Sequence, residues 1–533
     1  MKNTFLSLLR TPDDVKIQTD FSPLRYEEKG TPNPTDAQVQ FEITQNSLKI
    51  ILVPGKEPVR RLRLRFRGDL SGVLSILSDA WERASANHLI WKTFVPHEML
   101  PWYFHTNDGA SLHSYGVKTG ANAFAFWQCD PKGITLILDV RNGSAGVHLK
   151  EPLLCAEVVC REGIEGESPF AAAKAFCKMM CEKPNLPETP VYGFNNWYWA
   201  YGNTDQKTFV GEAKYLGSLA RDCAVRPYMV MDDGWEISRT KGYNGGPWTG
   251  CNERFSSMAE TAAQVREAGC RPGVWFRPLR TMGHVPEEAI FPSPCNIAAM
   301  GVVIDPTHPF TLERIARDTD RIAGWGYDLI KHDFTTLDLF DRWIDEDRAY
   351  PFFDNTLTNA QIFKNIYQTI QDNARGGIVI GCNTVGHLTA GIHQIQRIGD
   401  DTSGRSFEWT RRDGIHSMMR LPQAGTFSQI DPDCAAFTER VSAGVNLDFM
   451  EAMAITGSTV FASVTPGILT AREEARAAEI LNIAASITPG EYAEPLDWHR
   501  TSAPAEYLFR GKEYRYDWYS EYEGVRNTLT WTN

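Results

Sequence analysis

Three features that each mark a class of protein are missing from this chain of 533 residues. No stretch approaches the roughly 18 consecutive apolar residues that a membrane-spanning helix needs. A short apolar stretch near the start ends at Arg10 without a small-residue cleavage site after it, so we expect no signal peptide. Basic residues are not in excess, since 66 acidic and 54 basic residues give a formal net charge of −12. A chain this negative repels phosphate groups, and we expect neither a nucleic acid nor a membrane as its partner.

A regular cysteine spacing is missing as well. The eleven cysteines are scattered, and the close pairs Cys155/Cys160 and Cys177/Cys181 have no second Cys or His pair at the spacing of a zinc site. We therefore expect free thiols, a reducing cytoplasmic location and no bound metal. What is present is ordinary for a folded protein, because 42% of the residues are hydrophobic and 23% are charged.

Residues 1–183 are expected to form an antiparallel β-sandwich. Segments 38–43, 47–53 and 135–141 alternate apolar and polar residues, which is typical of strands with one buried face. Segment 61–67 alternates arginine with leucine or phenylalanine without a fault. We interpret its arginine row as a solvated sheet face and not as an anion-binding site.

A (β/α)8 TIM barrel is predicted at residues 184–487. The proline-rich stretch 184–190 is a stiff, non-helical connector in front of it. Eight short apolar runs then alternate with helical stretches such as 256–268 and 309–323, which is the size and pattern of such a barrel. The runs are 191–194, 227–231, 273–276, 327–330, 377–380, 395–398, 425–428 and 459–462.

The end of the chain is predicted to pack on this barrel. Segment 471–487 has the pattern of a last barrel helix. Residues 488–533 are rich in tyrosine and tryptophan but too few for an independent sandwich. We expect them to form a short C-terminal β-rich segment on the barrel.

Acidic residues follow several of the predicted strands. Asp232 and Asp233 follow the second run, Asp333 the fourth, and Asp400 and Asp401 the sixth. In a barrel of this type the active site lies at the carboxyl ends of the strands. Each short motif alone is weak and is better explained by a turn, a local ion pair or a helix cap. Carboxylates gathered at one barrel mouth, however, are costly unless they have a function.

Two facing carboxylates are the minimum for glycoside hydrolysis, one to attack the anomeric carbon and one to protonate the leaving oxygen. Lys331, two residues before Asp333 on the same strand face, favours an ionised nucleophile. The neighbours Asp400 and Asp401 favour a protonated acid. Tryptophans that suit stacking on a sugar ring lie near the same strand ends: Trp197, Trp199, Trp235 and Trp275.

The succession of these motifs resembles the α-galactosidases of glycoside hydrolase family 36, relatives of family 27. It extends from about residue 192 to residue 463, and its main segments are 232–235, 273–276, 325–334, 381–383 and 397–402. The resemblance implies a retaining enzyme that releases terminal α-linked galactose from an α-galactoside oligosaccharide or glycoconjugate. It implies no cofactor, and whether the chain forms a homo-oligomer stays open.

The resemblance also implies individual roles. Asp333 would be the nucleophile that forms a covalent glycosyl-enzyme. The acid/base would be Asp401 by its spacing from Arg397, or Asp400 by its place before an Asx-Thr pair, and we choose Asp401. The other residues would bind the sugar: Asp232 and Asp233 at the hydroxyls of C4 and C6, with Lys331, Arg397, Trp197, Trp235, Cys382 and Asp400.

Departures from the family pattern leave alternatives open. Segment 382–386 reads Cys-Asn-Thr-Val-Gly where many members have Cys-Ser-Gly-Gly-Gly-Arg, so an α-N-acetylgalactosaminidase is an alternative. Arg277 stands where a glutamate is frequent. A galactosyltransferase of the same fold, a sugar-binding protein without catalysis and a divalent-metal enzyme with aspartate ligands are further alternatives. We expect His387 and His393 to be structural, because the hydrolytic mechanism needs neither.

Overall fold

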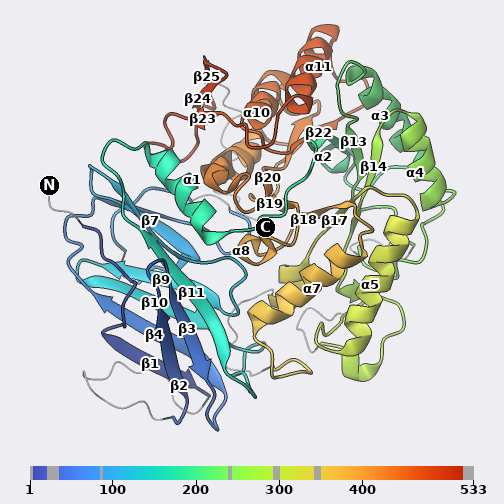
Figure 1. Cartoon of the computed structure of the whole chain (residues 1–533). Coiled ribbons are helices and arrows are strands. Elements are labelled where there is room, and N and C mark those ends of the chain that lie inside the picture. Colours follow the sequence, from blue (N-terminus) through green and yellow to red (C-terminus); the bar gives the residue numbers. More distant parts are fainter. Residues whose placement is uncertain are drawn as a thin grey trace, which may run out of the picture.

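The computed structural model describes residues 4–20, 35–84, 88–95, 97–237, 243–291, 301–340 and 350–519. Figure 1 shows the sheets of the N-terminal part beside a curled parallel sheet that is surrounded by helices. The predicted fold class is confirmed, because antiparallel sheets, a TIM-like barrel and C-terminal strands follow one another along the chain. Among the described helices, none is long and apolar enough to cross a membrane. The ten cysteines within these ranges are free.

The N-terminal part contains two antiparallel sheets, with strand orders β1-β4-β10-β9-β6 and β2-β3-β11-β8-β7-β5. The strands are β1 (Asp14–Thr19), β2 (Gln38–Ile43), β3 (Leu48–Val53), β4 (Val59–Arg67), β5 (Ser75–Ser78), β6 (Leu100–Pro101), β7 (Tyr103–Asn107), β8 (Leu112–Val117), β9 (Phe124–Asp130), β10 (Gly133–Asp139) and β11 (Leu153–Arg161). Helix α1 (Pro169–Met180) follows them, and the Ser168 side chain caps it by accepting the N–H of Ala171.

Strand β4 shows why the arginine row forms a sheet face. Its leucines and phenylalanine are fully buried, since Leu62, Leu64 and Phe66 have no exposed surface. The arginines between them lie on the other face, as the alternation of a strand requires. Each of them meets a carboxylate: Arg61–Asp139 at 3.1 Å, Arg63–Asp14 at 3.4 Å and Arg65–Asp130 at 2.9 Å. The row is neutralised within the sheet.

Nine parallel strands form the TIM-like barrel in the order β20-β19-β18-β17-β14-β13-β12-β22-β21. Only Pro432 and Asp433 separate the edge strands β20 (Gln429–Asp431) and β21 (Cys434–Phe437) in the chain, so the chain itself joins the two edges. The other strands are β12 (Tyr192–Asn195), β13 (Tyr228–Met231), β14 (Arg271–Phe276), β17 (Leu329–His332), β18 (Ile378–Gly381), β19 (Ile395–Arg397) and β22 (Val460–Val464).

Seven of the eight predicted runs coincide with or overlap a barrel strand. The prediction for 425–428 is wrong, because these residues form a turn before β20. Gly425 has a φ of 69°, and Ala424 and Ser428 are bridged to each other across the turn. Phe427 is 2% exposed, so tertiary burial and not strand formation accounts for its apolar character.

Helices cover the outside of the barrel, as Figure 1 shows. The long ones are α3 (Gln206–Leu219), α4 (Met258–Glu267), α5 (Pro309–Gly324), α7 (Asn359–Asn373), α10 (Ala443–Ile455) and α11 (Ala471–Ala485). The predictions at 256–268, 309–323 and 471–487 are confirmed by α4, α5 and α11. Short elements occupy the connections: α2 (Trp197–Ala200), α6 (Thr335–Phe340), α8 (Gly386–Thr389), α9 (Phe407–Trp409), β15 (Arg280–Thr281), β16 (Val302–Val303), η1 (Glu287–Ala289), η3 (Thr410–Ile415) and η4 (Met418–Gln423).

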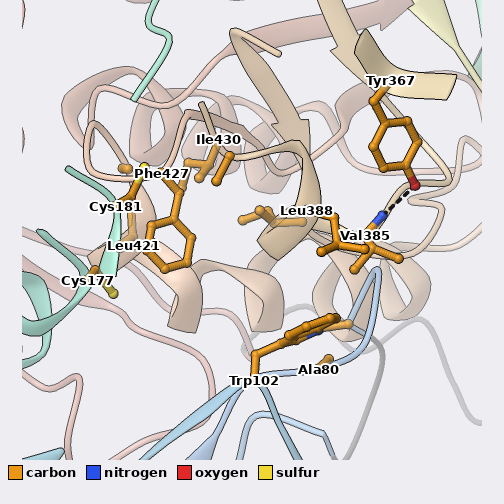
Figure 2. Close-up of a cluster of buried hydrophobic side chains, with 14 of the residues drawn as sticks. Ala80, Trp102, Cys177, Cys181, Tyr367, Val385, Leu388, Leu421, Phe427 and Ile430 are labelled. Carbon is orange, nitrogen blue, oxygen red and sulfur yellow. Dashed lines mark hydrogen bonds between the residues drawn. The ribbon is translucent and has the colours of Figure 1, made fainter. Parts of the chain in front are cut away.

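A buried apolar cluster fixes the N-terminal sheets to the barrel. Figure 2 shows Ala80 and Trp102 of the N-terminal part near Leu388 of the barrel. The His387 ring stacks on Trp102 with centroids 4.7 Å apart, and its Nε2 lies 2.9 Å from the carbonyl oxygen of Val117. Burial lowers the pKa of His387 to about 4. Its place in this contact agrees with the expected structural role.

The C-terminal strands β23 (Glu494–Pro495), β24 (Glu506–Phe509) and β25 (Lys512–Arg515) form a small antiparallel sheet. Trp498, between the first two, donates from Nε1 to the Met419 carbonyl at 2.8 Å. Its own carbonyl accepts the indole N–H of Trp91 at 3.2 Å. This segment therefore contacts both the barrel and the N-terminal part.

Candidate active site

Alternation along the barrel strands places polar side chains above an apolar interior. Side chains two residues apart on a strand point to the same face. If an apolar side chain points into the barrel, the side chain two residues later also points inward, one level nearer the carboxyl end of the strand. Four strands make this step: Val230 to Asp232, Leu329 to Lys331, Ile380 to Cys382 and Ile395 to Arg397. Four of the predicted site residues, Asp232, Lys331, Cys382 and Arg397, are thereby brought to the same end of the barrel.

Asp232 and Lys331 form a buried ion pair at this mouth. The Lys331 Nζ donates to Asp232 Oδ2 at 2.7 Å, and the Asn195 Nδ2 donates to the same oxygen at 2.8 Å. Burial alone would lower the pKa of Lys331, but the charge of Asp232 raises it well above its ordinary value. The sequence predicts Lys331 as a partner of Asp333. In the structure its hydrogen bond goes to Asp232, and Asp333 is a weaker electrostatic neighbour.

Asp333 follows β17 directly and is 9% exposed. The Trp275 indole of β14 donates to its Oδ2 at 3.0 Å, and the backbone N–H of Phe334 donates to its Oδ1 at 2.7 Å. Phe334 has a φ of 63°, a left-handed conformation that is rare for a bulky residue. Two donors thus hold the two carboxylate oxygens. Trp275, 1% exposed, orients Asp333 and offers no open face for sugar stacking.

Arg397 ties together the carboxylates beside β19. It is 1% exposed, and its Nη2 donates to Asp433, to Asp401 Oδ1 at 3.2 Å and to the Asp400 carbonyl at 2.9 Å. Asp433 also accepts the hydroxyl of Tyr198. Arg397 and Asp433 therefore form a buried ion pair, and the half-exposed Asp401 packs against it.

Asp400 and Asp401 face different surroundings. Asp401 interacts electrostatically with Lys331 at the barrel mouth. Asp400 instead acts on Arg412 and Asp413, both in the η3 segment. Arg397 meets the carboxylate of Asp401 at 3.2 Å but contacts Asp400 only through its backbone carbonyl. This contact ties the Asp401 side chain to β19.

An arginine from the N-terminal part completes this side of the site. Arg83 donates from Nη1 to Asp401 Oδ1 at 3.0 Å, and its Nη2 lies 3.2 Å from Asp400 Oδ1. The cations Arg397 and Arg83 hold the pKa of Asp401 below its ordinary value, so the expectation that the neighbouring carboxylate keeps this acid protonated is not met. Sequence reasoning missed Arg83, since it lies 318 residues before Asp401 and in no motif.

Three predicted binding residues differ in depth. Trp235 has no exposed surface and donates from Nε1 to the Trp275 carbonyl at 2.9 Å. Cys382 is 1% exposed and lies beside Arg397, whose Nη1 is 3.7 Å from its Sγ. Trp197, at the start of α2, is half-buried. Of the three, Trp197 alone is not fully buried.

Asp233 is linked to the residue that departs from the family pattern. The Asn244 Nδ2 donates to Asp233 Oδ2 at 3.5 Å, and its Oδ1 accepts from Arg277. Arg277 pairs through two nitrogens with Asp338, with Nε 2.8 Å from Oδ2. Its guanidinium lies 4.1 Å from the ring centroid of Phe334. Arg277 is thus neutralised by Asp338 and packs against the turn that follows Asp333.

The side chains that could bind a metal do not cluster within the described ranges, and His393 pairs with another buried histidine. Within the described ranges, no group of three or more His, Cys, Asp or Glu side chains is placed to hold a metal ion. His393 lies 3.0 Å, Nε2 to Nε2, from His332, and both are fully buried. Burial lowers the pKa of His332 to about 3. His393 therefore lies in a neutral, buried pair.

Comparison with solved structures identifies the fold. TtGalA, an α-galactosidase from Thermus thermophilus solved with p-nitrophenyl α-D-galactopyranoside, matches with a TM-score of 0.61 and 14% identity over 90% of this chain and 96% of that one. A variant of AgaA, a GH36 α-galactosidase from Geobacillus stearothermophilus solved with raffinose, gives 0.61 and 13% over 89% and 71%. The α-galactosidase from Lactobacillus brevis gives 0.57 and 12% over 89% and 70%.

The chain has the fold of the GH36 α-galactosidases, as its motifs predict. No protein-family profile and no curated protein sequence matches it. At such low sequence identity the similarity shows the fold alone, because one fold supports many activities. Function has to be argued from the residues at the mouth.

Proposed function

We propose that this protein is a retaining glycoside hydrolase that releases terminal α-linked galactose from α-galactosides. The observation that carries the proposal is the mouth itself. Asp333, held by Trp275, shares it with the Asp232–Lys331 pair and with Asp401. The galactosides bound to TtGalA and AgaA, which have the same fold, support the assignment.

In the first step, an oxygen of Asp333 attacks C1 of the galactose. The bond between C1 and the leaving oxygen breaks, and Asp401 gives that oxygen its proton. The donors from Trp275 and the Phe334 backbone hold the Asp333 carboxylate in one orientation, which favours attack from a fixed position. The aglycone leaves with a new hydroxyl, and galactose remains as an ester of Asp333.

In the second step, water releases the sugar. The ionised Asp401 takes a proton from a water molecule whose oxygen attacks C1, and the ester bond to Asp333 breaks. Galactose leaves with its original anomeric configuration, Asp333 is again a carboxylate and Asp401 is again protonated. The cations Arg397 and Arg83 beside Asp401 favour its ionised form, which is the form that this step needs.

Recognition of galactose falls to the side chains around Asp333. Asp232, which is paired with Lys331, and Asp233 accept the hydroxyl hydrogens at C4 and C6, which selects an axial O4. Arg397 donates to ring hydroxyls, and Trp197 offers an aromatic surface to the C–H face of the sugar. TtGalA binds stachyose and an AgaA variant binds raffinose, so we propose an α-galactoside oligosaccharide as the substrate class.

The proposal is tested with aryl α-glycosides of galactose, N-acetylgalactosamine, glucose and arabinose. Wild type is expected to hydrolyse the α-galactoside, and Asp333→Ala to lose this activity. Asp320→Ala, at a surface aspartate paired with Arg375, is the control and should keep it. A preference for the N-acetylgalactosaminide would assign the alternative glycon. A preference for the glucoside, or activity retained in Asp333→Ala, would contradict the proposal.

A further inference from the structure

The N-terminal part reaches the barrel mouth through segment 79–84, which we call the docking segment. It runs beside the end of β19: the Ala84 N–H donates to the Ile398 carbonyl at 2.8 Å, and the Asp400 N–H donates to the Ala84 carbonyl at 2.8 Å. These two backbone bonds fix the register between the docking segment and the residues that carry Asp400 and Asp401. The segment is therefore an integral part of the site.

Side chains other than Arg83 hold the docking segment in place. Arg420 of η4 donates from Nε to Asp79 Oδ1 at 2.6 Å and from its Nη atoms to the carbonyls of Ala80 and Glu82 at 2.9 and 2.6 Å. The Gln423 Nε2 donates to Asp79 Oδ2 at 3.0 Å. Both Asp79 and Arg420 are buried. Replacement of Arg83 thus leaves the anchor of the segment intact.

The Arg83 guanidinium is surrounded by acids. It contacts Asp401 and Asp400 as described, and its Nε lies 3.3 Å from Glu82 Oε1. Arg83 is 18% exposed at its side chain, so solvent screens these charges only in part. One cation here serves three carboxylates.

We propose that Arg83 is a positioning residue that holds Asp401 in its ionised form and thereby sets the pH range of the first catalytic step. The inference rests on the function proposed above, in which Asp401 is the acid/base. It assigns the N-terminal part a role in the chemistry of the barrel. Of the two arginines that contact Asp401, Arg397 belongs to a barrel strand and Arg83 comes from the N-terminal part.

The charged and titratable groups that face Asp401 come from several elements. Arg397 contacts it from β19, Lys331 acts from β17, Tyr198 lies on α2, and Asp400 precedes it in the chain. Arg397 is already paired with the buried Asp433, so much of its charge is balanced. Removal of Arg83 leaves Asp401 next to Asp400 and Glu82 without their shared cation, and a carboxylate among carboxylates holds its proton more tightly.

The effect has opposite signs in the two steps. Proton transfer to the leaving oxygen needs a protonated Asp401, whereas activation of water needs an ionised one. Arg83 therefore favours the second step at the expense of the first. Because kcat/KM reports the free enzyme and the first step, loss of Arg83 is expected to move the alkaline limb of its pH profile upward.

The test is the pH profile of kcat/KM on an aryl α-galactoside with a poor leaving group. Arg83→Gln is expected to raise the alkaline limb by roughly one pH unit, whereas Arg83→Lys, which keeps the charge, stays close to wild type. In an Asp401→Asn background, Arg83→Gln should change the rate no further, because the two residues act through one carboxylate. Thermal unfolding of all variants verifies that the docking segment remains bound.

The outcomes are distinguishable. An unchanged limb in Arg83→Gln, or an equal shift in Arg83→Lys, overturns the role of the Arg83 charge. If wild type hydrolyses no α-galactoside, the proposed function fails. The inference is then still tested by carboxyl ¹³C NMR titration of Asp401, assigned with Asp401→Asn: a midpoint that is higher in Arg83→Gln supports it, and an identical midpoint overturns it.

Discussion

The two sides of the candidate active site are built in different ways. On one side, Asp232 directly follows β13, Lys331 lies in β17 and Asp333 directly follows β17. Each is less than a tenth exposed. On the other side, the Asp401 side chain is 51% exposed, and one of its two arginines arrives from the N-terminal part. The barrel alone fixes the first side, whereas the second requires a docked segment from outside the barrel.

This difference fits the two tasks that the proposed retaining mechanism requires. A nucleophile and its sugar contacts need rigid positions, which buried hydrogen bonds provide. An acid/base has to change its protonation state twice in each cycle, and a half-exposed carboxylate between adjustable charges is suited to that. Under the proposed function, the boundary between buried and half-exposed acids separates positioning from proton transfer.

The largest expected effect tests whether Asp401 is the proton donor, because the contrast between the two sides of the site depends on this role. Asp401→Asn is expected to lower kcat/KM for a poor leaving group on the order of 10²–10⁴-fold, and to affect a good leaving group far less because it needs little protonation. Asp400→Asn is the matched control and should stay near wild type with both. If Asp400→Asn alone shows this split, Asp400 is the acid.

The buried side is expected to respond in stability. Lys331→Met leaves the Asp232 charge buried without its cation, which costs about 3–5 kcal/mol of unfolding free energy. The control is Arg375→Met, because the Arg375–Asp320 pair is short, 2.6 Å, but exposed on both partners. Chemical denaturation should show a lower midpoint for Lys331→Met and no change for Arg375→Met. Equal effects would contradict the distinction.

A smaller effect separates the orientation of Asp333 from its chemistry. Trp275→Phe removes the indole donor and keeps an aromatic side chain, so kcat/KM should fall roughly tenfold, as expected for one hydrogen bond to a charged group. Trp498→Phe removes a similar indole bond, which goes to the Met419 carbonyl and not to Asp333, and should leave kcat/KM unchanged. Steady-state kinetics on one aryl galactoside compares the two. Full activity in Trp275→Phe would exclude this positioning role.

Glu212 on α3 is a buried acid outside the candidate active site. We expect it to make the stability of the protein depend on pH without affecting catalysis. Burial raises the pKa of Glu212 to about 8, while the Trp199 indole donates to it. The folded protein keeps a proton that the unfolded chain releases above its ordinary pKa. The contribution of Glu212 to stability is therefore lost as the pH rises toward 8. Glu212→Gln should remove this loss, so that thermal midpoints of variant and wild type diverge from pH 5 to pH 9.

Sequence patterns predicted the barrel side well. The alternation that buries Leu329 also fixes where Lys331 and Asp333 point. Seven of the eight apolar runs that were predicted to be strands coincide with or overlap a barrel strand. Segment 425–428 was assigned as a strand because burial in a turn produces the same apolar pattern as a strand. Periodicity reports burial, and it does not report which backbone conformation achieves it.

Long-range packing could not be predicted from the same patterns. Arg83 meets Asp401 only because Arg420 and Asp79 anchor the docking segment across the domain contact. Trp235 follows a strand end but is covered by Trp248 and Trp325, with ring centroids 5.1 and 6.0 Å away. Such contacts depend on how separate elements pack, which a single chain's spacing does not encode.

Trapping of the glycosyl-enzyme tests the central claim most directly. Wild type is incubated with a 2-fluoro α-galactosyl donor that slows the second step, and the labelled peptide is mapped by mass spectrometry. The expected result is one galactosyl unit per chain on Asp333, released when an acceptor sugar is added. A label on any other residue, or hydrolysis that inverts the anomeric configuration, would contradict Asp333 as the nucleophile of a retaining hydrolase.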